Sequence, residues 1–130
     1  LAAELALRME RPLVRPRTRK AHEAALFAAE HDVGPPMRMA LYRAYWEEGR
    51  DIGRIDVLTS LIEELGVDPT ELKIALDIDR HSDAVAADIG LARRLRVGQV
   101  PTLFVGWGPE ARILQGARSL AALDEAISRG

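Results

Sequence analysis

Most of the chain carries apolar residues at helical spacing, three or four positions apart, with polar residues between them. Leu58, Leu61 and Leu65 show the pattern clearly, because they would lie on one face of a helix. The pattern predicts six helices, over residues 16–31, 37–48 and 51–66 and then beginning near Asp68, Ser82 and Ser119.

Proline and glycine mark the predicted ends of these helices. Gly34-Pro35-Pro36 separates the first two helices, and proline suits the first turn of the second. Gly66 stops the third helix, since glycine is favoured just past a helix end. Asp68-Pro69-Thr70-Glu71 then combines an N-cap, a proline at the first helical position and a carboxylate at the third. These signals predict where a fourth helix begins.

One stretch breaks the helical pattern. Thr102 to Val105 are four β-prone residues that follow Pro101 and end at Gly106. Proline has no N–H for a ladder but is tolerated at the first residue of a strand. A five- or six-residue loop leads to a second strand over residues 112–116. The two strands predict an antiparallel hairpin.

The first residues give weaker signals. Residues 1–9 suit the last turns of a helix, and residues 9–14 suit an edge strand at best, because Pro12 interrupts them. The chain begins at Leu1 in the middle of a helical pattern. We therefore expect it to be the remainder of a longer protein.

Composition narrows the function classes. At 130 residues the chain is one domain by size. A net charge of −2 argues against general binding to nucleic acid or anionic membranes. No apolar run approaches a membrane span of about 20 residues, no secretory signal is present, and we expect a cytoplasmic protein. Because cysteine is absent, the chain holds no disulfide, thiolate nucleophile or cysteine metal site.

Two patterns have both a structural and a functional interpretation. Residues 8–20 hold six basic residues and one acid, which is typical of a solvated face and also suits an anion-binding or partner-docking edge. In the second predicted helix, a stripe of methionine and aromatic residues is usually core. The same stripe could line a groove for a peptide or an apolar ligand; its members are Met37, Leu41, Ala44 and Tyr45, flanked by Ala40, Tyr42 and Trp46.

Two further patterns point away from a binding function. Residues 61–76 resemble a helix-turn-helix, but the second helix carries Asp68, Glu71 and Asp77 against Lys73 and would repel phosphates. Acidic residues and a histidine alternate in the following link, which favours caps and solvation over a metal site. These alternating residues are Asp77, Asp79, His81 and Asp83.

Four segments together resemble the DsbA family of thioredoxin-fold proteins, most closely its FrnE-like branch. Pro16-Arg17-Thr18-Arg19-Lys20-Ala21-His22-Glu23 opens the first helix, and Leu41-Tyr42-Arg43-Ala44-Tyr45-Trp46-Glu47-Glu48-Gly49-Arg50-Asp51-Ile52-Gly53 crosses the end of the second. Val97-Gly98-Gln99-Val100-Pro101-Thr102-Leu103-Phe104-Val105 and Leu114-Gln115-Gly116-Ala117 cover the hairpin. The resemblance spans nearly the whole chain.

The resemblance implies an α/β, thioredoxin-like fold of DsbA type with a helical insertion, truncated at the N-terminus and mostly helical with a small sheet. Residues 1–130 would form one domain: 16–96 the insertion and the following core helix, and 97–130 the C-terminal ββα of the core. The peptide between Val100 and Pro101 would be cis, and the Val100 backbone would offer hydrogen bonds to an extended substrate. The implied substrate-binding residues are Gln99, Val100, Pro101 and Thr102.

The same resemblance implies a thiol–disulfide oxidoreductase whose substrate is a thiol or disulfide protein or peptide, with no cofactor and no metal. The family's Cys-X-X-Cys begins a helix that would lie upstream of Leu1, so this chain would contain no catalytic residue. The strand before that helix is also missing, which would leave an edge of the hairpin bare. A second chain, a swapped segment or further residues would fill the gap.

Two other functions stay open. The related 2-hydroxychromene-2-carboxylate isomerases and kappa-class glutathione transferases share the fold and use a serine near the missing helix. Their segment after the hairpin usually reads aromatic-Gly-Gln/Asn-acidic-Arg, whereas residues 114–119 read Leu-Gln-Gly-Ala-Arg-Ser, which favours the oxidoreductase. A non-catalytic thioredoxin-like binding module is the third candidate. Cysteine, serine or a start codon upstream of Leu1 would distinguish the three.

Overall fold

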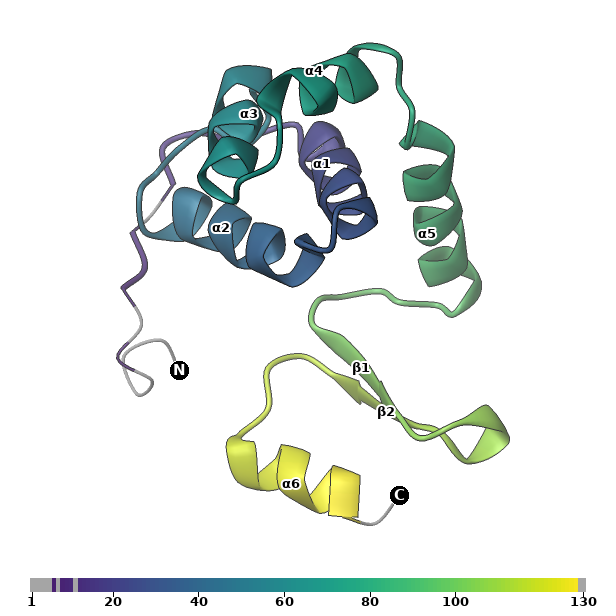
Figure 1. The fold of residues 1–130 in the computed structure, drawn as a ribbon. Helices are drawn as coiled ribbons and strands as arrows, with labels where there is room; N and C mark the ends of the chain where they lie inside the picture. Colours follow the sequence, from purple (N-terminus) through teal and green to yellow (C-terminus); the bar gives the residue numbers. More distant parts are fainter. Residues whose placement is uncertain (1–5, 7, 11, 129–130) are drawn as a thin grey trace. The chain divides into compact units, whose positions relative to one another are not determined.

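The computed structural model describes residues 6, 8–10 and 12–128, which divide into two compact units, Leu1–Ala87 and Asp88–Gly130 (Figure 1). The helix α5 crosses the boundary between them. None of the described helices has both the length and the hydrophobicity that a membrane crossing needs. The elements are α1 (Arg19–Glu30), α2 (Gly34–Trp46), α3 (Ile55–Glu64), α4 (Pro69–Asp77), α5 (Ser82–Arg94), β1 (Thr102–Val105), η1 (Gly108–Glu110), β2 (Arg112–Gln115) and α6 (Leu120–Ser128).

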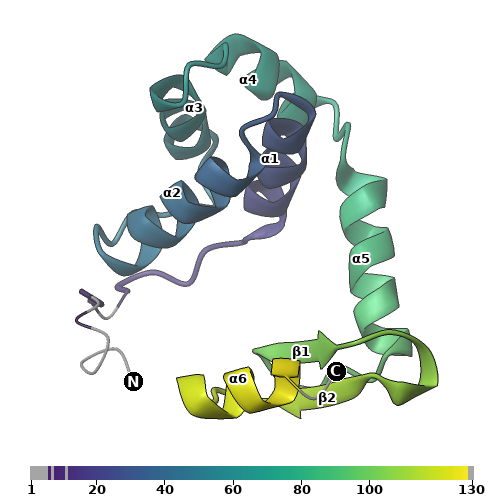
Figure 2. The ribbon, with the colours of Figure 1, turned by 60° about the horizontal axis from the view of Figure 1, so that its bottom comes forward.

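The first unit is a cluster of helices in which α1 contacts α2, α3 and α4 (Figures 1 and 2). The periodic apolar residues of the four helices meet in one core, as the spacing predicts. Its largest fully buried apolar side chains are Phe27, Met37, Leu58, Ile62, Leu72 and Leu76. The fourth helix begins where the sequence indicates, because the carboxylate of Asp68 accepts a hydrogen bond from the Thr70 amide at 2.7 Å.

Small residues allow α1 and α2 to approach closely. Ala24, Ala28 and Ala44 are fully buried at their contact. Gly34, at the start of α2, lies close to α1, since a Cβ there would lie 3.1 Å from the Cα of Ala29. A larger residue at position 34 would require the neighbouring backbone to shift by a few tenths of an ångström.

A lysine links α1 to the end of α4. The ammonium group of Lys20 donates to the Leu76 carbonyl, to Asp79 at 2.6 Å and to Glu23 at 3.3 Å. Glu23 is fully buried, and its Oε1 has no hydrogen-bond partner among the described residues. A buried carboxylate is costly without a partner, so Lys20 supplies the charge that makes this position tolerable.

The loop between α2 and α3 holds the residues that precede α1. Gly49 adopts a φ of +65°, and the Gly53 amide donates to the Asp51 carboxylate at 2.9 Å. A Cβ on Gly53 would lie 3.0 Å from the backbone nitrogen of Arg17. The segment that precedes α1 therefore packs directly on this loop. A larger residue at position 53 would displace that segment.

The first residues do not form the expected elements. Arg8 and Met9 are not helical, and the rest of the expected helix end is outside the described residues, apart from Ala6, which lies in a turn. The predicted edge strand over 9–14 is wrong for every described residue of that range. The Glu10 amide instead donates to the carbonyl of Trp46 at 2.7 Å. Pro12 interrupts the segment, and the described residues contain no neighbouring strand to pair with it.

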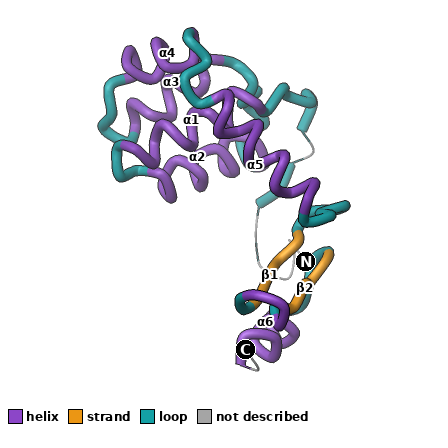
Figure 3. Tube along the Cα trace, turned by 90° about the vertical axis from the view of Figure 1, so that its right-hand side faces the viewer, coloured by secondary structure: helices purple, strands orange, loops and turns teal. Residues whose placement is uncertain are grey.

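The second unit contains the last part of α5, the hairpin and α6 (Figure 3). The hairpin is confirmed: β1 and β2 are antiparallel, Thr102 pairs with Gln115, and Val105 pairs with Arg112. The Ser119 hydroxyl accepts from the Ala122 amide and caps α6, as predicted.

The apolar side chains of α6 are only partly buried. Ala126 is buried, but Leu120 and Ile127 are 74% and 64% exposed. Apolar side chains of the hairpin are exposed as well, namely Leu103, Phe104 and Ile113. A unit with two short strands offers too little apolar surface to cover both the sheet and the helix.

We predict that Lys20→Met lowers the free energy of unfolding by about 3 kcal/mol, because it leaves the buried Glu23 without its cation. The matched control is Lys73→Met, which removes an exposed pair with Asp77 and should cost less than about 1 kcal/mol. Urea unfolding followed by circular dichroism measures both. Equal, small effects of the two substitutions would contradict the role assigned to Lys20.

The effect of Lys20→Met should also depend on pH. The hydrogen bond from Lys20 holds the pKa of Asp79 below its ordinary value. A carboxyl whose pKa is lowered by folding contributes stability above its unfolded pKa, about 4, and loses it as the pH falls through the folded value. The difference in unfolding free energy between the wild type and Lys20→Met should therefore shrink as the pH drops below about 4. A difference that grows in acid would contradict this.

We predict that Gly53→Ala destabilises the first unit by about 1–3 kcal/mol, because the added methyl group collides with the Arg17 backbone. Gly90→Ala is the control: the nearest atom to its new Cβ is the flexible end of Arg94 at 3.4 Å. In the middle of α5 this control should be neutral or stabilising by up to about 1 kcal/mol. Thermal unfolding distinguishes the two, and a neutral Gly53→Ala would refute the close approach.

Candidate functional site

The end of the loop between α5 and β1 and the first residue of β1 hold the four residues that the sequence analysis names as substrate-binding. Two residues after α5 ends, Arg96 adopts a left-handed conformation with a φ of +55°. The Val97 amide donates a hydrogen bond to the Ala92 carbonyl at 2.9 Å. This closing turn directs the chain out of the helix and into the loop. Gln99, Val100, Pro101 and Thr102 then lead directly into the first strand.

Two hydrogen bonds fix both ends of the loop. The Thr102 hydroxyl donates to the Gln99 carbonyl at 2.6 Å, which spans the turn. The Gly116 amide donates to the Pro101 carbonyl at 2.8 Å, which joins the loop to the end of β2. Gly116 has a φ of +78°, a conformation that side chains other than glycine's rarely adopt. The peptide bond between Val100 and Pro101 is cis, as the sequence resemblance implies.

Val100 is the open position of the loop. Its residue surface is 87% exposed. Within the part of the chain that the structure describes, neither its N–H nor its carbonyl has a hydrogen-bond partner. The carbonyl groups of the residues on both sides, Gln99 and Pro101, each accept a hydrogen bond. The loop therefore presents the backbone donor and acceptor of one residue to the outside, two positions before the start of β1.

The loop offers hydrogen-bonding groups but no ionisable or nucleophilic side chain suited to catalysis near neutral pH. None of its four side chains ionises near neutral pH, and the chain has no cysteine. What the loop does offer is a backbone donor, a backbone acceptor and the exposed apolar side chain of Val100. This combination suits an extended peptide, which needs main-chain hydrogen bonds from a strand edge.

The alternating acidic residues before α5 already have partners. Asp77 pairs with Lys73 at 2.6 Å, and Asp79 pairs with Lys20. His81 is nearly buried and contacts Glu30 at 3.0 Å; this hydrogen bond lowers the pKa of the Glu30 carboxyl. No cluster of three or more potential ligands suited to a metal ion is found among the described residues.

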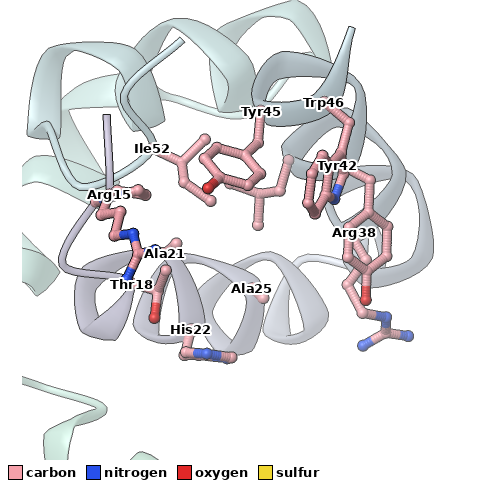
Figure 4. Close-up of a pocket in the computed structure, with 12 residues that line it drawn as sticks. Arg15, Thr18, Ala21, His22, Ala25, Arg38, Tyr42, Tyr45, Trp46 and Ile52 are labelled. Carbon is pink, nitrogen blue, oxygen red and sulfur yellow. The ribbon is translucent and has the colours of Figure 1, made fainter. Parts of the chain in front are cut away.

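A hollow lies in the first unit, between α1 and α2 (Figure 4). Its volume is about 390 Å³. The aromatic stripe of α2 contributes to it, because Leu41, Tyr42, Tyr45 and Trp46 line the hollow while Met37 and Ala44 are core. The core interpretation of the stripe is therefore confirmed for Met37 and Ala44, and the interpretation as a ligand groove stays a prediction. The sequence analysis did not connect this stripe with Arg15, which lies at one end of the hollow (Figure 4).

Comparison with known proteins gives three findings. Residues 2–128 match the model of the DSBA-like thioredoxin domain. The chain is 30% identical over 131 residues to the uncharacterized protein YwbO of Bacillus subtilis (strain 168), a match that covers 98% of this chain and 64% of that protein. It also resembles the crystal structure of a "putative protein disulfide isomerase" from Nitrosomonas europaea, with a TM-score of 0.69 and 20% identity over 85% of this chain and 54% of the other. The chain thus spans less than two thirds of the length of either protein.

We predict that hydrogen exchange will distinguish the Val100 amide of the loop from the Gly116 amide after β2. The Val100 amide has no partner among the described residues and should exchange at a rate close to that of an unfolded peptide. The Gly116 amide is bonded to Pro101 and should exchange more slowly, by about tenfold or more. Exchange measured by NMR tests this, and a Val100 amide as protected as that of Gly116 would contradict the open backbone.

Proposed function

Because this chain belongs to the DsbA-like thioredoxin domain family, we propose that it is the substrate-binding part of a thiol–disulfide oxidoreductase of the FrnE-like type. The family and the thioredoxin-like fold predicted from the sequence are both confirmed. The observation that carries the proposal is that the N–H and the carbonyl of Val100, close to the start of β1, have no hydrogen-bond partner among the described residues.

In this proposal an extended segment of the substrate lies along the loop and adds to the sheet. The Val100 N–H donates to a substrate carbonyl, and the Val100 carbonyl accepts from a substrate amide. Thr102 and Gly116 act as positioning residues, since their hydrogen bonds hold the loop while leaving Val100 open. Gln99 contributes the carbonyl that Thr102 binds, and Pro101 the carbonyl that Gly116 binds.

The reactive thiols would come from outside these 130 residues. Thiol–disulfide exchange needs an attacking thiolate, and the sequence has no cysteine. The matched proteins are longer than the matched part, which leaves room for a redox motif in the natural protein. The chain's own task is then to hold the substrate while a cysteine elsewhere in the protein exchanges with it.

Assignment to the FrnE-like type rests on the segment from Leu41 to Gly53. Its last residues form the loop that supports the entry to α1, with Gly53 against Arg17 and Asp51 bonded to Gly53. The residues of this segment thus have linked structural roles in the first unit.

We also propose that a further segment or a second copy of the chain completes the sheet. A two-stranded sheet is marginally stable alone, and Leu103, Phe104 and Ile113 are exposed on it. Additional strands would cover these residues and pair the open edge. The cytoplasmic location predicted from the sequence stays a prediction.

Photo-crosslinking tests the docking proposal. A photoreactive amino acid replaces Val100 in the longer protein that contains the redox cysteines, and the control carries it at Trp107, which is 95% exposed. A reduced, unfolded substrate protein should crosslink at position 100 and much less at position 107. Equal crosslinking at both positions would show that exposure alone, and not docking at the loop, captures the substrate.

Activity tests the reaction class. The longer protein should oxidise or reduce disulfides of a model substrate, and the 130-residue chain alone should not exceed the uncatalysed rate. Replacement of the upstream cysteines by serine should remove the activity. A longer protein that has serine instead of cysteine at that helix, and no exchange activity, would refute the oxidoreductase and favour the isomerase or transferase alternative.

A further inference from the structure

The hollow between α1 and α2 is concave and largely apolar. Ala21, Leu41 and Ile52 form its buried floor, and Tyr45 is half-buried in its wall. A volume of about 390 Å³ falls in the range of small-molecule sites, about 300–1,000 Å³. Such a hollow can enclose a small organic molecule but not a folded domain.

The charges at this hollow have one sign. Arg15 and Arg38 are among the residues that line it, and none of its described lining residues is acidic. Neither arginine makes a hydrogen bond or ion pair within the described part of the chain. Most other arginines of the first unit are paired, for example Arg54 with Asp56 at 2.9 Å. The hollow is therefore left with cations that an anion could neutralise.

The two arginines lie at opposite ends of the hollow. Figure 4 shows Arg15 and Thr18 at one end, with the hydroxyl group of Tyr45 turned toward that end. Arg38 lies beyond the ring of Tyr42 at the other end, and its guanidinium points away from the hollow. The first end therefore combines a guanidinium with hydroxyl donors, which is the set of groups that binds a carboxylate.

The position of Arg15 is fixed by the fold. Residues 15–18 enter α1 across the loop at Gly53, which packs against the backbone of Arg17. Trp46, which ends α2, and Ile52, which lies in that loop, also line the hollow. The segments that carry the family resemblance, 16–23 and 41–53, thus meet around this hollow.

We propose that the hollow binds a small organic anion with an apolar body, whose carboxylate lies at Arg15 and whose apolar part lies over Leu41, Tyr45 and Ile52. This site lies wholly in the first unit. The proposal does not rest on the redox function, because it needs neither the Val100 loop nor a cysteine.

Octanoate serves as the probe, and octan-1-ol and octylammonium as neutral and cationic molecules of the same length. Trp46 reports binding by its fluorescence. A Trp107→Phe background removes the other tryptophan of the sequence, so the whole signal comes from the hollow. Isothermal titration calorimetry on the same protein gives an independent dissociation constant.

Octanoate should bind with a dissociation constant below about 10 mM, and octanol and octylammonium should bind at least about tenfold more weakly. Arg15→Gln should weaken octanoate about tenfold and leave octanol unchanged. Arg38→Gln should weaken octanoate less than about twofold. Arg93→Gln, an exposed arginine on α5, is the control that should change nothing.

Three results would overturn the proposal. Octanol that binds as tightly as octanoate would mean that the hollow only attracts apolar molecules. A larger loss of octanoate affinity in Arg38→Gln than in Arg15→Gln would place the carboxylate at the Arg38 end of the hollow. No heat and no change in Trp46 fluorescence up to about 10 mM octanoate would mean that the hollow does not bind this class. Circular dichroism of each variant verifies that a loss of binding is not a loss of folding.

Discussion

The hydrogen bond between the Gly116 amide and the Pro101 carbonyl determines what the candidate site can do. It holds the loop against the end of the hairpin, at a glycine whose φ of +78° few other residues could adopt. This bond occupies the carbonyl of Pro101, and the hydroxyl of Thr102 donates to the carbonyl of Gln99. Val100, between these two residues, has an N–H and a carbonyl with no partner among the described residues. The proposed binding thus depends on which backbone groups of the loop are already bonded and which stay open.

The two units have different energetic characters. The first contains a continuous core in which Phe27, Met37 and Leu58 are fully buried, and its only fully buried acidic side chain among the described residues is neutralised by Lys20. The second has one buried side chain in α6, Ala126, and leaves large apolar residues of its hairpin exposed. The core of the first unit accounts for its folding by ordinary hydrophobic burial. The exposed hairpin accounts for the proposal that further chain covers it.

Local signals in the sequence were sufficient for much of this structure. Asp68 and Ser119 cap helices through their own side chains, and Pro101 and Gly106 bracket a strand. Such features depend on residues a few positions apart, so a single sequence reveals them. The failures concern distant partners. Residues 9–14 have strand-like composition, but a strand needs a neighbour, and the described residues provide none. Similarly, no local signal in the sequence indicates that Arg15 and Tyr45 line the same hollow. Their segments meet through the packing of Gly53 on Arg17, which is a contact between residues distant in the sequence.

The central claim is that the backbone of Val100 receives an extended substrate. NMR of the Val100 amide, recorded while a reduced, unfolded peptide is added to the protein, tests this most directly. The account predicts that this amide shifts with the peptide concentration and becomes protected from exchange, while the amide of Trp107 does not change. A peptide that binds the protein and leaves the Val100 amide unshifted and unprotected would contradict the account.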